Sequence, residues 1–147
     1  MIISNIRWIL GIHRWENVVL GGLTAVITEI IGLLGGWDLW LKALILFIVC
    51  DYVSGLLAAG VEKRLNSQVG FRGIVKKIFI LILVVVAYQI DLVLGLTVIR
   101  LMVIGFYLGI EGLSILENAV RCGLEVPDSL KNTLETIKTG EDRNYKK

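Results

Sequence analysis

Four long apolar stretches, separated by short polar segments, occupy most of the chain. They cover residues 18–36, 41–60, 74–94 and 98–116. Each has close to the ~20 residues that a helix needs to cross the hydrocarbon core of a bilayer. Only a few residues around Gly95 separate the last two stretches, so these two should form an antiparallel hairpin. The pattern predicts an all-α, polytopic membrane protein with four transmembrane helices within residues 18–118.

The polar segments at the two ends each carry apolar residues at helical spacing. Residues 1–17 predict a short amphipathic helix in the membrane interface, with a solvated start as the alternative. Residues 119–147 form a polar tail, in which Pro127-Asp128-Ser129 is a helix-start signal. This signal predicts a short amphipathic helix that packs on the membrane, on a neighbouring subunit, or on nothing. The apolar repeats are Ile2, Ile6, Ile9 and Leu10 at the first end, and Leu130, Leu134 and Ile137 at the second.

Composition excludes several protein classes. Hydrophobic residues make up 56% of the 147 residues and charged residues only 19%, too apolar a balance for a soluble domain of this size. The formal net charge of +2 does not indicate a nucleic-acid binder. Cys50 and Cys122 form no CxxC pair, and His13 is the only histidine, so no His-based metal site or catalytic triad is expected. We expect no cofactor, no metal and no enzyme activity.

The distribution of positive charge predicts the topology. Thirteen of the 15 Lys and Arg residues fall before the first stretch, between the second and third, or after the fourth. The positive-inside rule then places both termini and the middle loop in the cytoplasm. The first stretch contains Glu29 and several glycines, so an alternative has it lying on the membrane, which leaves three spans and an external N-terminus. The predicted basic cytoplasmic loop contains Lys63, Arg64, Arg72, Lys76 and Lys77.

Every apolar stretch contains one or more acids, including Glu29, Asp51, Asp91 and Glu111. A charge at mid-bilayer costs ~3 kcal/mol on insertion scales, so such residues usually face a protein interior or water. Alternatively, an acid near the end of a span reaches the interface, which is the interpretation we favour for Asp91. The sequence shows no patterned His or Lys partner, and a proton relay is therefore weakly supported.

The fourth stretch has two different faces. Its polar residues fall in one stripe at ~100° per residue, which makes the stripe a candidate lumen lining. Its glycines lie on the opposite face with GxxxG spacing, which favours close helix packing. Burial of the stripe within a single copy of the chain is the alternative. The stripe consists of Arg100, Tyr107, Glu111, Ser114 and Asn118, and the predicted helix-packing residues are Gly21, Ala25, Gly32, Gly55, Gly105, Gly109 and Gly112.

Three stretches, taken in order and spacing, resemble the toxin-secretion and phage-lysis holins of Gram-positive hosts. They are residues 51–59 (DYVSGLLAA), the basic segment 62–74, and residues 111–118 (EGLSILEN) followed by 123–127 (GLEVP). The resemblance covers about residues 41–137. Ile110 departs from the family, whose members often carry a polar Asn before the Glu.

The resemblance implies a non-enzymatic function. Such holins accumulate in the host's cytoplasmic membrane, form homo-oligomers and open lesions through which an endolysin, or in relatives a toxin, leaves the cell. The partner enzyme need not touch the holin. Two rival hypotheses remain at this point: a small ion or solute carrier that uses the intramembrane acids, and a membrane scaffold that transports nothing.

Overall fold

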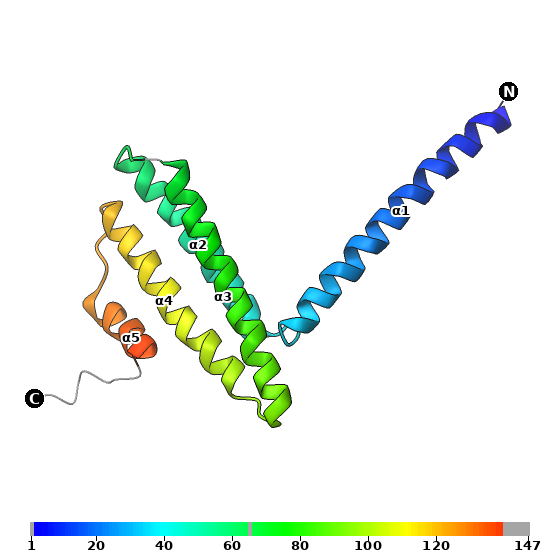
Figure 1. Ribbon diagram of the computed structural model, residues 1–147. Coiled ribbons are helices and arrows are strands. Elements are labelled where there is room, and N and C mark those ends of the chain that lie inside the picture. The colour runs from blue at the N-terminus through cyan, green and yellow to red at the C-terminus, as the bar shows by residue number, and fades with distance from the viewer. Residues whose placement is uncertain (1, 65, 140–147) are drawn as a thin grey trace, which may run out of the picture.

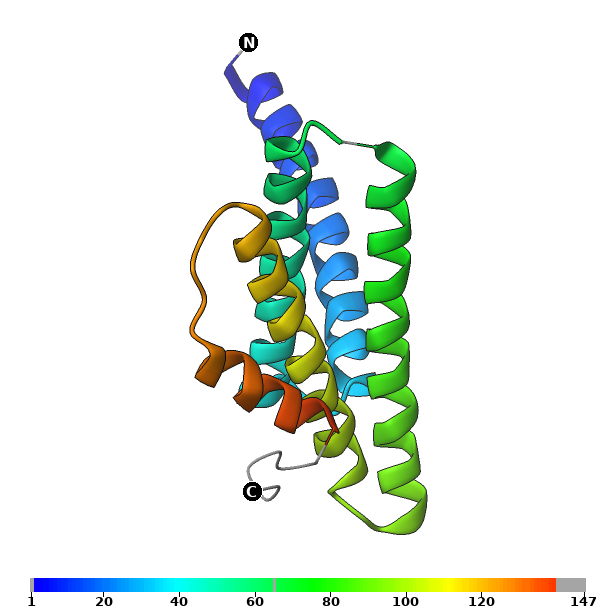
Figure 2. The ribbon, with the colours of Figure 1, turned by 90° about the vertical axis from the view of Figure 1, so that its left-hand side faces the viewer.

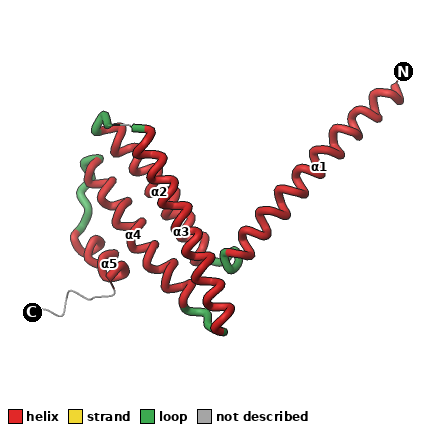
Figure 3. Tube along the Cα trace, viewed as in Figure 1, coloured by secondary structure: helices red, strands yellow, loops and turns green. Residues whose placement is uncertain are grey.

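The computed structural model describes the backbone of residues 2–64 and 66–139, and the side chains of residues 15–64, 66–68, 70–133 and 136. The described residues form five helices and no strand, so the predicted all-α class is confirmed (Figures 1 and 3). Four helices contain segments long and apolar enough to cross a membrane, namely Trp15–Leu33, Leu39–Val61, Gly70–Leu94 and Ile99–Arg121. The helices are α1 (Ile2–Leu33), α2 (Leu39–Val61), α3 (Ser67–Leu94), α4 (Ile99–Arg121) and α5 (Asp128–Thr139).

Local capping explains where the helices begin and end. The Asp38 carboxylate accepts a hydrogen bond from the Leu41 amide at 2.8 Å and caps α2. Asn66 caps α3 in the same way, through the Gln68 amide at 2.9 Å. Gly95 ends α3 in the left-handed region, with φ 65°, which glycine adopts without steric cost. The chain then turns into α4, and α3 and α4 form the expected hairpin (Figure 1).

The start of α3 corrects one prediction. The sequence analysis assigned Arg72, Lys76 and Lys77 to a loop, whereas all three lie on α3. The physical reason is the cap at Asn66, which starts the helix two turns before the apolar stretch begins. Only Lys63 and Arg64 of the predicted basic loop lie in or next to the connection between α2 and α3. Helix geometry therefore fixes the directions of the other three side chains.

Helices α2, α3 and α4 form the packed part of the molecule. α4 contacts both α2 and α3, whereas α2 and α3 contact each other much less. The core between them contains Leu44, Val84 and Ile104, all fully buried. Large apolar side chains cover the outer faces of the three helices, as expected for surfaces that meet lipid.

The two end helices differ in how they pack. α1 is one continuous helix that projects away from the bundle, and the apolar segment Trp15–Leu33 has no buried residue (Figure 1). The proposed division at residue 17 therefore coincides with no break in the helix, and interfacial binding of residues 1–17 stays a prediction. α5 begins at the predicted signal and lies across α4 of the same chain (Figure 2). The cytoplasmic position of the tail likewise stays a prediction.

Candidate functional site

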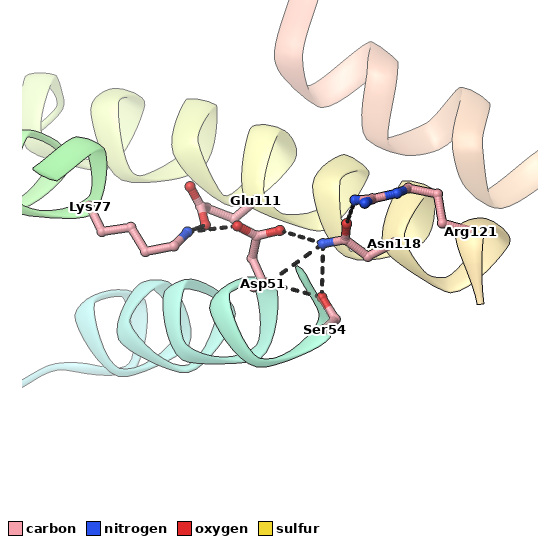
Figure 4. A network of polar contacts seen from close by, with 6 residues as sticks. All are labelled: Asp51, Ser54, Lys77, Glu111, Asn118 and Arg121. Atoms are coloured by element: carbon pink, nitrogen blue, oxygen red, sulfur yellow. Dashed lines mark hydrogen bonds and ion pairs between the residues drawn. The ribbon is translucent and has the colours of Figure 1, made fainter. Parts of the chain in front are cut away.

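One charged residue from each helix of the bundle meets at its centre (Figure 4). Lys77 of α3 donates a hydrogen bond to Asp51 of α2, with Nζ and Oδ2 2.7 Å apart. It also donates to Oε2 of Glu111 on α4. The side chains are only 12%, 18% and 6% exposed for Lys77, Asp51 and Glu111. We call these three residues the central triad.

A chain of hydrogen bonds extends the triad toward the connection between α2 and α3. Asn118 donates through Nδ2 to Asp51 Oδ1 at 3.1 Å and to Ser54 Oγ at 3.0 Å. Arg121 donates to the Asn118 side-chain oxygen and to both carboxylate oxygens of Glu62, each at 2.9 Å. The hydrogen bonds from Arg121 hold the pKa of Glu62 below its usual range. These contacts tie α2 to α4 along one line of polar groups.

The central triad is unequal in charge. It holds two carboxylates and one ammonium group, so full ionisation leaves one excess negative charge among buried side chains. A bilayer interior penalises such a charge strongly. The excess can be balanced by a bound proton or by water that enters from an open cleft beside the triad. The arrangement is therefore suited to a change of proton occupancy or hydration rather than to bond chemistry.

The cleft beside the triad has a volume of about 860 Å³ and lies among α2, α3 and α4. Asp51, Lys77 and Glu111 line it, and so do Tyr107, Ser114 and Asn118 of the predicted polar stripe. The stripe thus faces the chain's own α2 and α3. A lumen lined by these residues requires the three helices to separate, and its existence stays a proposal.

A second polar cluster lies at the opposite end of α4. Arg100 donates through Nη1 to Asp38 at 2.6 Å and through Nε to the Leu34 carbonyl at 2.6 Å. Asp91 accepts hydrogen bonds from the Ile99 and Arg100 amides at 3.0 and 2.9 Å, and so satisfies the first turn of α4. Hydrogen bonding from Arg100 lowers the pKa of Asp38. We call Arg100, Asp38 and Asp91 the end cluster.

The structure brings together some predicted residues and separates others. Arg100 belongs to the end cluster, about two helical turns before Tyr107, and does not line the cleft with the rest of the stripe. Asp91 is near a helix end, as expected, and it is 3% exposed and bonded to the first turn of α4, while its position relative to the membrane interface stays a prediction. Glu29 lies on the exposed surface of α1. Of the four predicted acids, only Asp51 and Glu111 share a site.

The predicted helix-packing glycines also divide into two groups. Gly109 and Gly112 are buried within the chain. A Cβ at Gly55 would lie 3.5 Å from Nδ2 of Asn118, so this glycine allows α2 and α4 to approach at the network. The others have open space around them: a Cβ would meet no atom within 4 Å at Gly21, Gly32 or Gly105, and Ala25 is exposed. Packing of these exposed positions against other copies stays a prediction.

Sequence reasoning missed one member of each cluster, Lys77 and Asp38, and three residues of the hydrogen-bond chain, Ser54, Glu62 and Arg121. Lys77 was not recognised as the partner of the acids, because it was assigned to the loop. Ser54 and Asp38 were not singled out as site residues. The spacing from Asp38 to Leu41 is a helix-cap signal that could have identified Asp38.

Comparison with known proteins identifies the family of the chain. Residues 25–139, most of the chain, match the bacteriophage holin family. The chain belongs to this family. The match includes the last nine residues of α1 and all of α2 to α5, a wider range than the resemblance seen in the sequence. Holin family membership favours a membrane protein that is not an enzyme.

Relatives of this holin family member occur in bacteria and in a phage. The chain is 55% identical over 113 residues to the uncharacterised protein Lmo0128 of Listeria monocytogenes, covering 75% of this chain and 81% of the relative. It is 38% identical over 136 residues to the uncharacterised protein BH0965 of Halalkalibacterium halodurans, covering 88% and 96%. It is 29% identical over 109 residues to the probable holin of Bacillus phage phi105, covering 74% and 81%. No solved structure matches the chain.

Proposed function

We propose that the chain is a holin that assembles into homo-oligomers in the cytoplasmic membrane of a bacterial host and opens lesions there. An endolysin, or a secreted toxin, would cross the membrane through these lesions. Membership of the holin family and the four apolar helices support the proposal. Both termini would then lie in the cytoplasm, as the distribution of Lys and Arg predicts.

The observation that carries the proposal is the central triad. Its three charged groups come from three different helices, and Lys77 bonds both acids inside the spans. In a closed form, these bonds keep polar groups away from lipid. If α2, α3 and α4 separate, the same side chains become hydrated and can line a water-filled opening. The excess charge of the triad favours the hydrated form, and the Lys77 contacts oppose it.

Expression in a bacterial host with and without a co-expressed endolysin tests the proposal. A holin causes a sudden loss of viability in both cases, and rapid lysis only when the endolysin is active. A carrier would instead give pH-coupled solute movement without passage of folded protein. A scaffold would give neither effect. Growth at the normal rate with the protein present in the membrane would contradict the proposal.

Reporter fusions test the orientation separately. Fusions before Met1 and after Lys147 are expected to behave as cytoplasmic. An external signal from the N-terminal fusion alone would favour the three-span alternative, in which α1 does not cross the membrane.

A further inference from the structure

The cleft beside the central triad has a second group of residues that the network does not use. Arg64, Arg72 and Lys76 line the cleft and are exposed. None of the three forms an ion pair within the part of the chain that the structure describes. The other lining cations, Lys77 and Arg121, are bonded to carboxylates. Three exposed positive charges therefore line this cleft without forming an ion pair in the described residues.

The cleft is open because α3 carries glycines where it faces α2. A Cβ at Gly73 would lie 3.9 Å from Cδ2 of Tyr52, and one at Gly70 would lie 3.8 Å from the Tyr52 hydroxyl. The Tyr52 ring thus occupies the space nearest these glycines, and a larger side chain on α3 would extend into the cleft. The cleft therefore depends on Gly70, Gly73 and Tyr52, and not on the residues of the central triad.

The cations lie at one end of the apolar segments, from where long basic side chains can extend to the headgroup region. The apolar segment of α3 begins at Gly70 and that of α2 ends at Val61, so Arg64 lies just outside the span. Arg72 and Lys76 lie about 3 and 9 Å along α3 from Gly70, at ~1.5 Å per residue. Basic pockets between transmembrane helices at this level are suited to the headgroups of anionic lipids.

The cleft is also lined by one further acid, exposed Glu117, by several polar side chains and by apolar ones. Its five cations outnumber its three acids, so the lining is positive overall. Leu56 and Phe79 line the cleft and are 42% and 59% exposed. An occupant that satisfies the whole cleft needs a negative group for the cations and a long apolar part for these side chains. A small inorganic anion satisfies only the first requirement.

We propose that this cleft binds an anionic phospholipid. Its phosphate lies among Arg64, Arg72 and Lys76, and one acyl chain lies against Phe79 and Leu56. The proposal requires membrane insertion but not lesion formation, so it can fail or succeed independently of the holin function.

Binding of phosphatidylglycerol to the purified full chain in non-ionic detergent tests the proposal, with phosphatidylcholine and inorganic phosphate as the other probes. Retained lipid can be counted by native mass spectrometry. Phosphatidylglycerol is expected to bind in preference to phosphatidylcholine. Arg72→Gln and Lys76→Gln should each weaken its binding about fivefold, the effect of one cation near an anionic headgroup.

Two further variants separate charge from shape. Lys63→Asn removes a cation at the same end of the bundle without touching the cleft, and it should bind like the unaltered protein. Asn is chosen because Lys63 has φ 56°, a left-handed conformation that Asn tolerates. Gly73→Leu keeps every charge but fills the cleft, and it should lower binding while the helical content stays unchanged.

Three results would overturn the proposal. One is equal binding by Arg72→Gln, Lys76→Gln and Lys63→Asn, which would mean that the lipid follows overall charge. Another is equal retention of phosphatidylcholine and phosphatidylglycerol. The third is displacement of phosphatidylglycerol by millimolar inorganic phosphate, which would indicate a small-anion site without an acyl chain.

Discussion

The two polar clusters on α4 use the same kinds of residue but differ in what balances their charges. In the end cluster, Asp91 bonds the amides at the first turn of α4, where the helix dipole favours a negative charge. Asp38, its second carboxylate, lies outside the spans and is 41% exposed to solvent. In the central triad, Asp51 and Glu111 share one ammonium group and no helix terminus lies nearby.

This difference separates a structural contact from a switchable one. The end cluster is satisfied in the described arrangement, because the backbone and solvent take up its second negative charge. It joins the end of α1, the start of α2 and the start of α4. The central triad keeps an excess charge that a proton, water or the cations of the adjoining cleft must balance. We therefore expect changes in the end cluster to affect folding, and changes in the triad to affect the timing of opening.

Loss of Arg100 should lower the free energy of unfolding more than the other substitutions. Arg100→Met leaves Asp38 and two carbonyl groups without their donor, and each buried acceptor left without a hydrogen bond costs about 1–3 kcal/mol. The free energy of unfolding in detergent measures this loss. Lys42→Gln is the matched control, since Lys42 is an exposed cation near the same end of α2. Equal stability of the two variants would show that the end cluster does not hold the fold together.

Substitutions on the glycine face of α4 should have the next largest effect on stability. Gly109 and Gly105 should differ in this effect. Gly109→Leu places a side chain where the helix is already buried, and overpacking of this kind costs about 1–3 kcal/mol. Gly105→Leu adds a side chain in open space and should leave stability almost unchanged.

Chemical crosslinking of Gly105→Leu shows whether the same face also packs between copies. The sequence pattern predicts that this variant loses oligomers while its fold survives. Normal oligomers from Gly105→Leu would remove Gly105 from the subunit contact.

Acid should weaken the end cluster by a smaller amount. The Arg100 hydrogen bond lowers the pKa of Asp38, so Asp38 stabilises the fold at pH values above its unfolded pKa of about 3.9. This contribution is lost as the pH falls through the still lower pKa of the folded state. Because Asp38 is partly exposed, we expect less than about 1 kcal/mol.

Unfolding of the unaltered chain and of Asp38→Asn between pH 6 and pH 2 checks this prediction. The stability difference between the two proteins should be constant at the upper end of the range and should disappear at the lower end. A difference that grows as the pH falls would contradict the lowered pKa.

The sequence predicted the helices much better than the contacts between them. Apolar length alone located the four spans, and Pro127-Asp128-Ser129 located the start of α5. The pairing of Lys77 with two acids could not be predicted in the same way, because those partners are 26 and 34 residues away in the chain. Their meeting depends on how three helices rotate against one another.

Periodicity likewise identified the polar stripe on α4 but not what it faces. A stripe of this kind fits a lumen between subunits and a contact inside one chain equally well. The bonds from Asn118 to Asp51 and Ser54 show that the second applies to the described structure. Both interpretations could hold only if the helices separate between a closed and an open form. A sequence pattern does not encode such a change.

Timed lysis with a co-expressed endolysin tests the central claim most directly, namely that the unequal charge of the triad sets the balance between closed and open forms. Glu111→Gln leaves Asp51 and Lys77 as a neutral pair, which favours the closed form, so lysis should be delayed. Lys77→Gln leaves two carboxylates without a cation, which favours hydration, so lysis should come early. Glu29→Gln is the matched control, because Glu29 is an exposed acid on α1.

The measurement compares lysis times at equal protein levels, checked by blot. The account predicts shifts of opposite sign for Glu111→Gln and Lys77→Gln and no shift for Glu29→Gln. Unchanged lysis times for both triad variants, or shifts in the same direction, would mean that the triad is a structural contact like the end cluster.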